Sequence, residues 1–155
     1  MMWAVSAVVA ILLLGLGLQA AETSFPPGPA GIEAMIRHTA NSAGVDPAVM
    51  LAICRKESSF NPAAVNPADP SYGLFGIKPT PWLAHFGYSS DYVQLFNAQT
   101  NATLACKIVE YFQERGFVFP DQADIYNVGE TLWAKGRRNV AYRDSIKSFY
   151  RSFNV

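Results

Sequence analysis

Charged side chains are scarce in this sequence, and neither sign is in excess. They make up 15% of the 155 residues, against about a quarter in typical soluble proteins. Twelve basic residues balance 12 acidic ones. A zero net charge excludes the basic footprint of nucleic-acid-binding proteins, so we expect no nucleic-acid partner. The chain length predicts one domain that can bury a sizeable core.

Metal-ligand patterns are also missing. The sequence has no Cys-x-x-Cys, and its two histidines, His38 and His85, lie far apart without ligand spacing. A zinc site is therefore not expected, and nothing else in the sequence indicates a metal or a cofactor.

The first 21 residues contain no charged side chain and include the apolar run VVAILLLGLGL, followed by Ala20 and Ala21. These features are typical of a secretory signal, although no Lys or Arg precedes the run. The segment is also near the length that spans a bilayer, so a retained anchor that contacts the membrane and a buried helix remain alternatives. We expect a leader over 1–21, a Pro- and Gly-rich linker over 22–31 and one domain over 32–155.

Cys54 and Cys106 are the two cysteines of the chain. In an exported protein, such a pair predicts a disulfide. The bond would close a loop of about fifty residues and stabilise the fold by roughly 4 kcal/mol. Two buried free thiols are the alternative.

Most of the remaining sequence has helical periodicity, with apolar residues at spacings of three and four. Asp46 and Pro47 are suited to begin a helix whose run Val49–Cys54 is apolar all round, which predicts a central, buried position. The expected helices cover 32–40, 45–59, 104–115, 121–129 and 142–153. The Pro-rich segment 61–81 predicts an irregular loop with a short strand or extended piece at YGLFGI. The fold class is therefore mostly α.

Glu57 lies three residues after Cys54, on the same helix face at the rim of the apolar run. Burial there would raise the pKa of its carboxyl, as a general acid near neutral pH requires. A solvated carboxylate at a helix end is the alternative.

The text around Glu57 resembles the signature of lytic transglycosylases, in the soluble-transglycosylase (SLT) branch of the lysozyme-like superfamily. The matching elements are Glu57-Ser58, Phe60-Asn61-Pro62, Ala64-Val65 and Tyr72–Ile77, then Ile125–Glu130 and Val140–Tyr142. The resemblance covers residues 32 to 149. It implies an α+β lysozyme-like domain with a catalytic cleft, acting on peptidoglycan.

The resemblance also implies residue roles. Glu57 would be the single catalytic acid/base. It would cleave the bond between N-acetylmuramic acid and N-acetylglucosamine and leave a 1,6-anhydro sugar. Ser58 would bind substrate or stabilise the helix end, Tyr126 would hold Glu57 by a hydrogen bond, Asn127 would bind an N-acetyl or saccharide group, and Tyr142 would line the cleft.

The segment Tyr72–Ile77 would form the opposite wall of the cleft, with Gly73 and Gly76 contributing backbone groups. The rings of Tyr72, Phe75 and Trp82 are suited to pack on sugars. Gly76 departs from the family pattern, which has Gln there. We expect one polar contact to be lost, or to be supplied by water or by Lys78.

Two other functions remain open. A lysozyme-type hydrolase would need a second carboxylate. Asp69 is the first candidate, ahead of Asp91, Asp121 and Asp124, although Asp69 also fits a turn between prolines. A non-catalytic glycan-binding module of an envelope-spanning machine or virion is the other alternative.

The expected location is outside the cytoplasm, in the periplasm or cell envelope. By analogy with small enzymes of this type, the expected partners are peptidoglycan strands and a secretion, conjugation or phage-entry complex.

Overall fold

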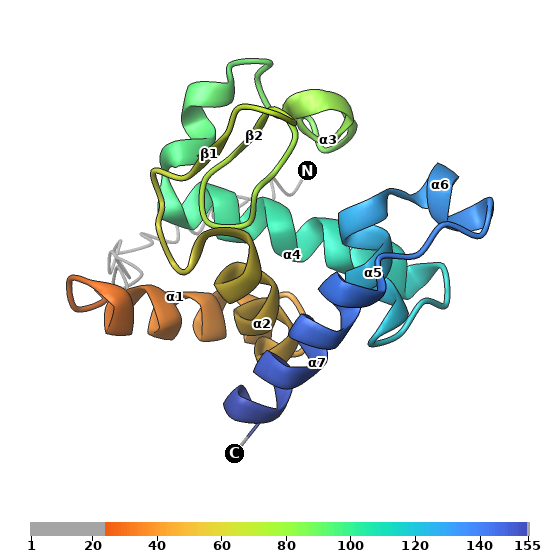
Figure 1. Ribbon diagram of the computed structural model, residues 1–155. Helices are drawn as coiled ribbons and strands as arrows, with labels where there is room; N and C mark the ends of the chain where they lie inside the picture. The colour runs from red at the N-terminus through yellow and green to blue at the C-terminus, as the bar shows by residue number, and fades with distance from the viewer. Residues whose placement is uncertain (1–23, 155) are drawn as a thin grey trace, which may run out of the picture.

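The computed structural model describes residues 24–154, so the predicted leader lies outside the described residues. Helices dominate this part of the chain, as predicted for a mostly α fold (Figure 1). The helices and strands are α1 (Pro29–Ser42), α2 (Pro47–Ser58), β1 (Val65–Asn66), β2 (Ser71–Tyr72), α3 (Pro79–His85), the 3-10 helix η1 (Tyr92–Phe96), α4 (Ala98–Glu114), α5 (Asp121–Val128), α6 (Glu130–Ala134) and α7 (Val140–Phe153).

Helix α2 is the centre of the core. Asp46 caps it by accepting a hydrogen bond from the Ala48 amide at 2.8 Å, and Pro47 occupies its first turn. Every residue from Ala48 to Cys54 is buried, and α2 packs against α1 and α7. The apolar run predicted this position, because a helix that is apolar on all sides needs neighbours on all sides.

Helix α2 ends in an unusual turn. Ser59 and Phe60 both have positive φ, 52° and 66°, although neither is glycine. Residues other than glycine rarely adopt this conformation. Here the buried side chain of Phe60 fixes it, and the chain turns sharply into the Pro-rich segment directly after Glu57. The last turn of α2 therefore lies at the edge of the core.

The elements that follow form two groups around α2 and α4. The β1–β2 pair and α3 lie on one side, and α5, α6 and α7 lie on the other (Figure 1). The strands pair antiparallel, Val65 opposite Tyr72, and a further bridge joins Tyr72 to Ile77. The short strand expected within YGLFGI is thus only its first residue, paired within a loop.

Three short helices, α3, η1 and α6, were not predicted from the sequence. Helix α3 begins at Pro79, inside the segment predicted to be irregular, because proline is well suited to a first helical turn. Helix α1 likewise begins at Pro29, inside the predicted linker. None of the helices within residues 24–154 is both long and apolar enough to span a bilayer.

The predicted disulfide is wrong, because Cys54 and Cys106 are both free and buried. Cys54 lies on α2, which packs on α1 and α7, whereas Cys106 lies on α4, which packs on α1, η1 and α5. The Cys54 sulfur faces the Ser58 hydroxyl at 3.9 Å. Burial raises the pKa of each thiol to about 12, so both stay protonated. Sequence spacing gave no information on the Cβ separation that a disulfide requires.

Because no disulfide joins the two helices, we expect a reducing agent to leave the melting temperature unchanged. A thiol reagent should titrate two groups in the protein denatured without reductant, and none rapidly in the native protein. A melting temperature that falls by several degrees on reduction would instead support a disulfide between Cys54 and Cys106.

Candidate active site

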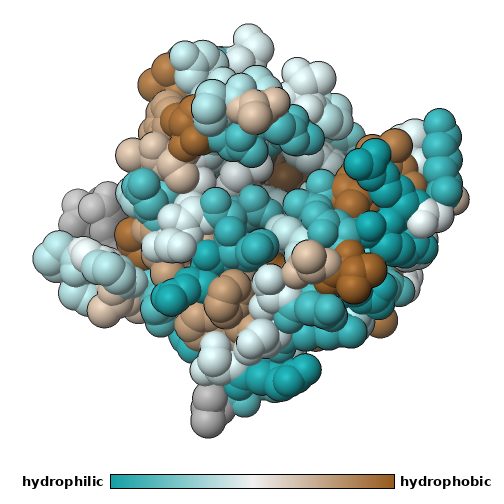
Figure 2. Space-filling view, viewed as in Figure 1, coloured by the Kyte–Doolittle hydropathy of each residue, from teal (hydrophilic) through white to brown (hydrophobic). Residues whose placement is uncertain are grey.

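A cleft of about 410 Å³ lies between the β1–β2 segment, α3 and α4 on one side and α5 and α6 on the other. The space-filling view shows this face hollowed between the β1–β2 segment and α6 (Figure 2). The residues that line the cleft include polar, charged and aromatic side chains and a glycine: Glu57, Asn66, Asp69, Gly76, Lys78, Trp82, His85, Tyr111, Tyr126, Asn127 and Glu130.

Glu57 projects into this cleft from the last turn of α2 and is half-buried. Its Oε1 accepts a hydrogen bond from the Tyr142 hydroxyl at 2.7 Å. Burial raises the pKa of the Glu57 carboxyl, and the Tyr142 hydrogen bond and the charges of Lys56 and Lys78 oppose this rise only in part. The carboxyl can therefore hold a proton at higher pH than an ordinary glutamate.

Tyr142 holds Glu57 in place. Its side chain is 4% exposed and lies in the first turn of α7. Burial, followed by the negative charge of Glu57, raises the pKa of the Tyr142 hydroxyl well above its usual value. The hydroxyl therefore remains a hydrogen-bond donor at any pH near neutrality. The sequence predicted that Tyr142 lines the cleft and assigned this hydrogen bond to Tyr126. Tyr142 is instead buried beside Glu57 and does not line the cleft.

Tyr126 instead fixes the cleft wall. Its hydroxyl donates to the Phe75 carbonyl at 2.8 Å, while Ser58 Oγ donates to the Leu74 carbonyl at 2.7 Å. The buried Asn101 of α4 accepts from the Phe75 amide and donates to the carbonyls of Tyr72 and Leu95, at 2.8 to 3.0 Å. Side chains from three helices thus hold the backbone of the Tyr72–Ile77 segment.

Two aromatic rings predicted to pack on sugars face away from the cleft. The Phe75 ring is fully buried. The Tyr72 ring stacks on Tyr92 with 4.6 Å between centroids. Successive residues of a strand point to opposite faces, and Ser71 lines the cleft, so Tyr72 points away from it. Trp82 does line the cleft. Gly73 is buried against Asn101 and Leu95 rather than exposed to the cleft.

Gly76 lies directly against Glu57. Its φ is +55°, and a Cβ there would stand 2.8 Å from Glu57 Oε2. A side chain at position 76 would therefore strain the backbone and press on the carboxylate. The presence of glycine rather than glutamine at position 76 therefore leaves space for the Glu57 carboxylate. The sequence had indicated only the loss of one polar contact.

The other carboxylates of the cleft are engaged in ion pairs. Asp69 Oδ2 lies 2.7 Å from Lys78 Nζ, and both side chains are about half exposed. Glu130 pairs with Arg115 and accepts a hydrogen bond from the Tyr111 hydroxyl at 3.3 Å. Glu57 is the lining carboxylate whose contact is a hydrogen bond from a buried hydroxyl rather than an ion pair.

Asn101 and Asn139 were missed by sequence reasoning, and Asp124 was considered in a different role. Asn101 interrupts the apolar face that Leu104, Ala105 and Ile108 define on α4, which is a readable signal. Asn139 caps α7, and Asp124 is fully buried beneath it. Asp124 was considered only as a second carboxylate; in the structure it lies 3.7 and 3.8 Å from the guanidinium nitrogens of Arg138 and Arg143 and does not line the cleft.

Comparison with known families gives one result that bears on this geometry. The family model described as "Transglycosylase SLT domain" matches residues 34–148. This range contains Glu57, both tyrosines of the site and every element from α2 to α6. The search of curated proteins gives no match to the chain.

Gly76 and Gly87 form a matched pair for testing the contact with Glu57. Gly87 has φ +73° and open space where its Cβ would stand. Gly87→Ala should therefore cost only about 1–2 kcal/mol of unfolding free energy for the backbone strain. Gly76→Ala should cost about 1–2 kcal/mol more, since its Cβ displaces the half-buried carboxyl of Glu57. Denaturant unfolding of both variants measures this, and equal costs would show that the Cβ does not disturb Glu57.

The raised pKa of Glu57 predicts a pH-dependent effect on stability. Between the ordinary glutamate pKa of about 4.3 and the higher folded value, the folded state binds more protons than the unfolded state, so wild-type stability falls as pH rises. Glu57→Gln removes this loss. The variant should melt above the wild type at pH 7, and the difference should shrink toward pH 3.5. A difference that is independent of pH would show that the carboxyl is not perturbed.

Proposed function

Because the chain belongs to the SLT-domain family of lytic transglycosylases in the lysozyme-like superfamily, we propose that it cleaves peptidoglycan glycan strands with Glu57 as its single acid/base. The observation that carries this proposal is the half-buried Glu57 carboxyl in the cleft, with a raised pKa and one oxygen held by Tyr142. This is the arrangement that proton transfer to a leaving group requires.

The bond cleaved is the β-1,4 link from N-acetylmuramic acid to N-acetylglucosamine. Glu57 in its acid form donates a proton to the glycosidic oxygen as the bond to C1 breaks. The resulting carboxylate then accepts the proton of the muramyl C6 hydroxyl, whose oxygen closes onto C1. The product is a 1,6-anhydro sugar, the acid form of Glu57 is restored, and no water is consumed.

The state of the other carboxylates supports one acid rather than two. A hydrolase of the two-carboxylate type needs a second, available carboxylate across the sugar from the acid. Asp69 and Glu130 are the other carboxylates that line the cleft, and each forms an ion pair, Asp69 with Lys78 and Glu130 with Arg115. The intramolecular C6 hydroxyl therefore serves as the nucleophile in place of an activated water.

Tyr142 gives Glu57 its direction during both proton transfers. The hydrogen bond fixes Oε1, so that Oε2, beside Gly76, is the oxygen that carries the proton to and from the substrate. The donated hydrogen bond also stabilises the carboxylate formed after the first transfer. Trp82 offers a flat face to a sugar further along the cleft.

The substrate polymer lies outside the cytoplasmic membrane, so we propose that the protein acts in the periplasm or cell envelope, with residues 1–21 as export signal or anchor. Action beside a secretion, conjugation or phage-entry complex fits a small wall-cleaving domain, by analogy.

The proposal predicts the mass of the products. Incubation of the protein with purified peptidoglycan should release muropeptides with anhydro ends, which are lighter by one water than the products of hydrolysis. Glu57→Gln should lower the rate by about 10²–10⁴-fold, the range attributed to general acid–base catalysis, while the fold is retained. Reducing ends in the products would favour the hydrolase, and binding without release by the wild type would favour the glycan-binding module.

A further inference from the structure

Asn139 connects the two sides of the site, although neither the sequence nor the mechanism above uses it. It is the N-cap of α7, and its Oδ1 accepts from the Tyr142 amide at 3.1 Å. Its Nδ2 donates to Asn127 Oδ1 at 2.9 Å. Its own amide donates to Asp124 Oδ1 at 3.2 Å. One residue thus contacts the helix turn that carries Tyr142 and the cleft-lining Asn127.

These contacts fix the direction of both side-chain amides. The Tyr142 backbone amide can only donate, so it must meet the oxygen of Asn139. The nitrogen of Asn139 then faces Asn127, and only the oxygen of Asn127 can receive its proton. The orientation of the Asn127 amide therefore follows, through Asn139, from a backbone group of α7.

Asn127 lines the cleft next to Tyr126, on the last turn of α5. Its oxygen is occupied by Asn139, and no residue within 24–154 accepts a hydrogen bond from its Nδ2. The amide accordingly presents N–H donors to the cleft. A carbonyl oxygen of an N-acetyl group, or a hydroxyl oxygen of a sugar, is the complementary partner.

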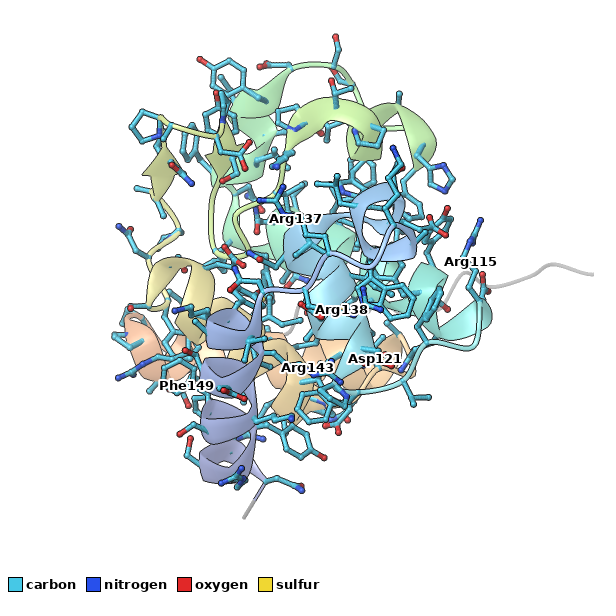
Figure 3. The ribbon with its side chains drawn as sticks, turned by 45° about the vertical axis from the view of Figure 1, so that its right-hand side comes forward. Arg115, Asp121, Arg137, Arg138, Arg143 and Phe149 are labelled. Carbon is cyan, nitrogen blue, oxygen red and sulfur yellow. The ribbon has the colours of Figure 1, made fainter. Side chains whose placement is uncertain are left out.

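The backbone of Asn139 is anchored independently of the cleft. Asp124, which is fully buried on α5, accepts from the Asn139 amide and lies 3.7 Å from Arg138 Nε and 3.8 Å from Arg143 Nη1. Arg143 also pairs with Asp121 at 2.7 Å. Figure 3 shows Arg143 beside Asp121 where α7 meets α5, with Arg138 nearby. This cluster holds the start of α7 against α5.

We propose that Asn139 is a positioning residue: it orients the Asn127 amide so that Asn127 donates a hydrogen bond into the cleft. Through this orientation Asn139 contributes to specificity for an N-acetylated sugar. The proposal rests on the proposed function for the identity of the substrate. It assigns to Asn139 an effect on sugar binding that is separate from its role as a helix cap.

Asn139→Asp separates these two effects. Aspartate is as good an N-cap as asparagine, so α7 and the Tyr142–Glu57 hydrogen bond should be retained. A carboxylate has no proton to give to Asn127. The Asn127 amide would then turn its nitrogen toward the introduced carboxylate and present its oxygen to the cleft. There it would face the carbonyl or hydroxyl oxygen of the sugar, so that two acceptors meet without a proton between them.

Asn97→Asp is the matched control. Asn97 is the exposed N-cap of α4 and accepts from the Thr100 amide at 2.9 Å. The same change of chemistry at a helix N-cap occurs there without a link to the cleft. Asn139→Ala removes the cap and the donor together, and its melting temperature gives the reference for loss of the cap.

The experiment measures binding of the N-acetylglucosamine tetramer by calorimetry, turnover of peptidoglycan, and melting temperature, for the wild type and the three variants. Asn139→Asp should weaken tetramer binding and raise KM about tenfold, the effect of one hydrogen bond lost with an unpaired acceptor left behind. Its kcat and melting temperature should stay near those of the wild type. Asn97→Asp should change none of these quantities, and Asn139→Ala should lower the melting temperature as well.

The outcomes distinguish this inference from the proposed function. Wild-type binding of the tetramer by Asn139→Asp would overturn the inference, as would a loss in melting temperature equal to that of Asn139→Ala. A wild type that does not bind the tetramer would also overturn it. A wild type that binds the tetramer but releases no muropeptides would refute the proposed function and leave the role of Asn139 supported by the binding data.

Discussion

The hydrogen bond between Tyr142 and Glu57 is the contact on which the site depends, because it joins a buried hydroxyl to a carboxyl that burial has partly removed from water. The carboxyl lies at the end of α2 and the hydroxyl in the first turn of α7, so the bond exists only if these helices pack in one register. The packing between these two helices therefore fixes the position of the Glu57 carboxyl. A shift of α7 along α2 would leave a half-buried carboxylate without its protein donor, which is unfavourable.

The two sides of the cleft are built differently. On the side of α5 and α7, side chains are held by side chains and caps, with Asp124 and its arginine partners behind them. On the side of the Pro-rich segment, Ser58, Asn101 and Tyr126 bind main-chain atoms. This explains how a segment with almost no regular structure forms a wall with a fixed position: polar side chains from three helices replace the ladder that a sheet would provide.

The sequence was sufficient to predict the helical class, the buried α2, the cleft position of Glu57 and the placement of Tyr126, Asn127 and Tyr142 near it. It assigned the Glu57 hydrogen bond to the wrong tyrosine, because the direction of a hydroxyl depends on how α7 packs and neighbouring motifs do not encode that. It placed the rings of Tyr72 and Phe75 in the cleft because an aromatic residue in a loop looks the same whether it faces sugar or core. The disulfide failed for a similar reason, since a separation in sequence gives no distance in space.

The way the wall is held has a consequence for how such a cleft can diversify. Its position is fixed through backbone carbonyls, which every residue type possesses, and through one backbone amide, which every type except proline possesses. The side chains that point from it into the cleft, such as Asn66, Asp69 and Lys78, take no part in the hydrogen bonds that hold residues 72 to 75. They can be exchanged without moving the backbone around Glu57. The backbone of the wall thus keeps its position while its cleft-facing side chains vary, so selection can alter glycan preference one side chain at a time.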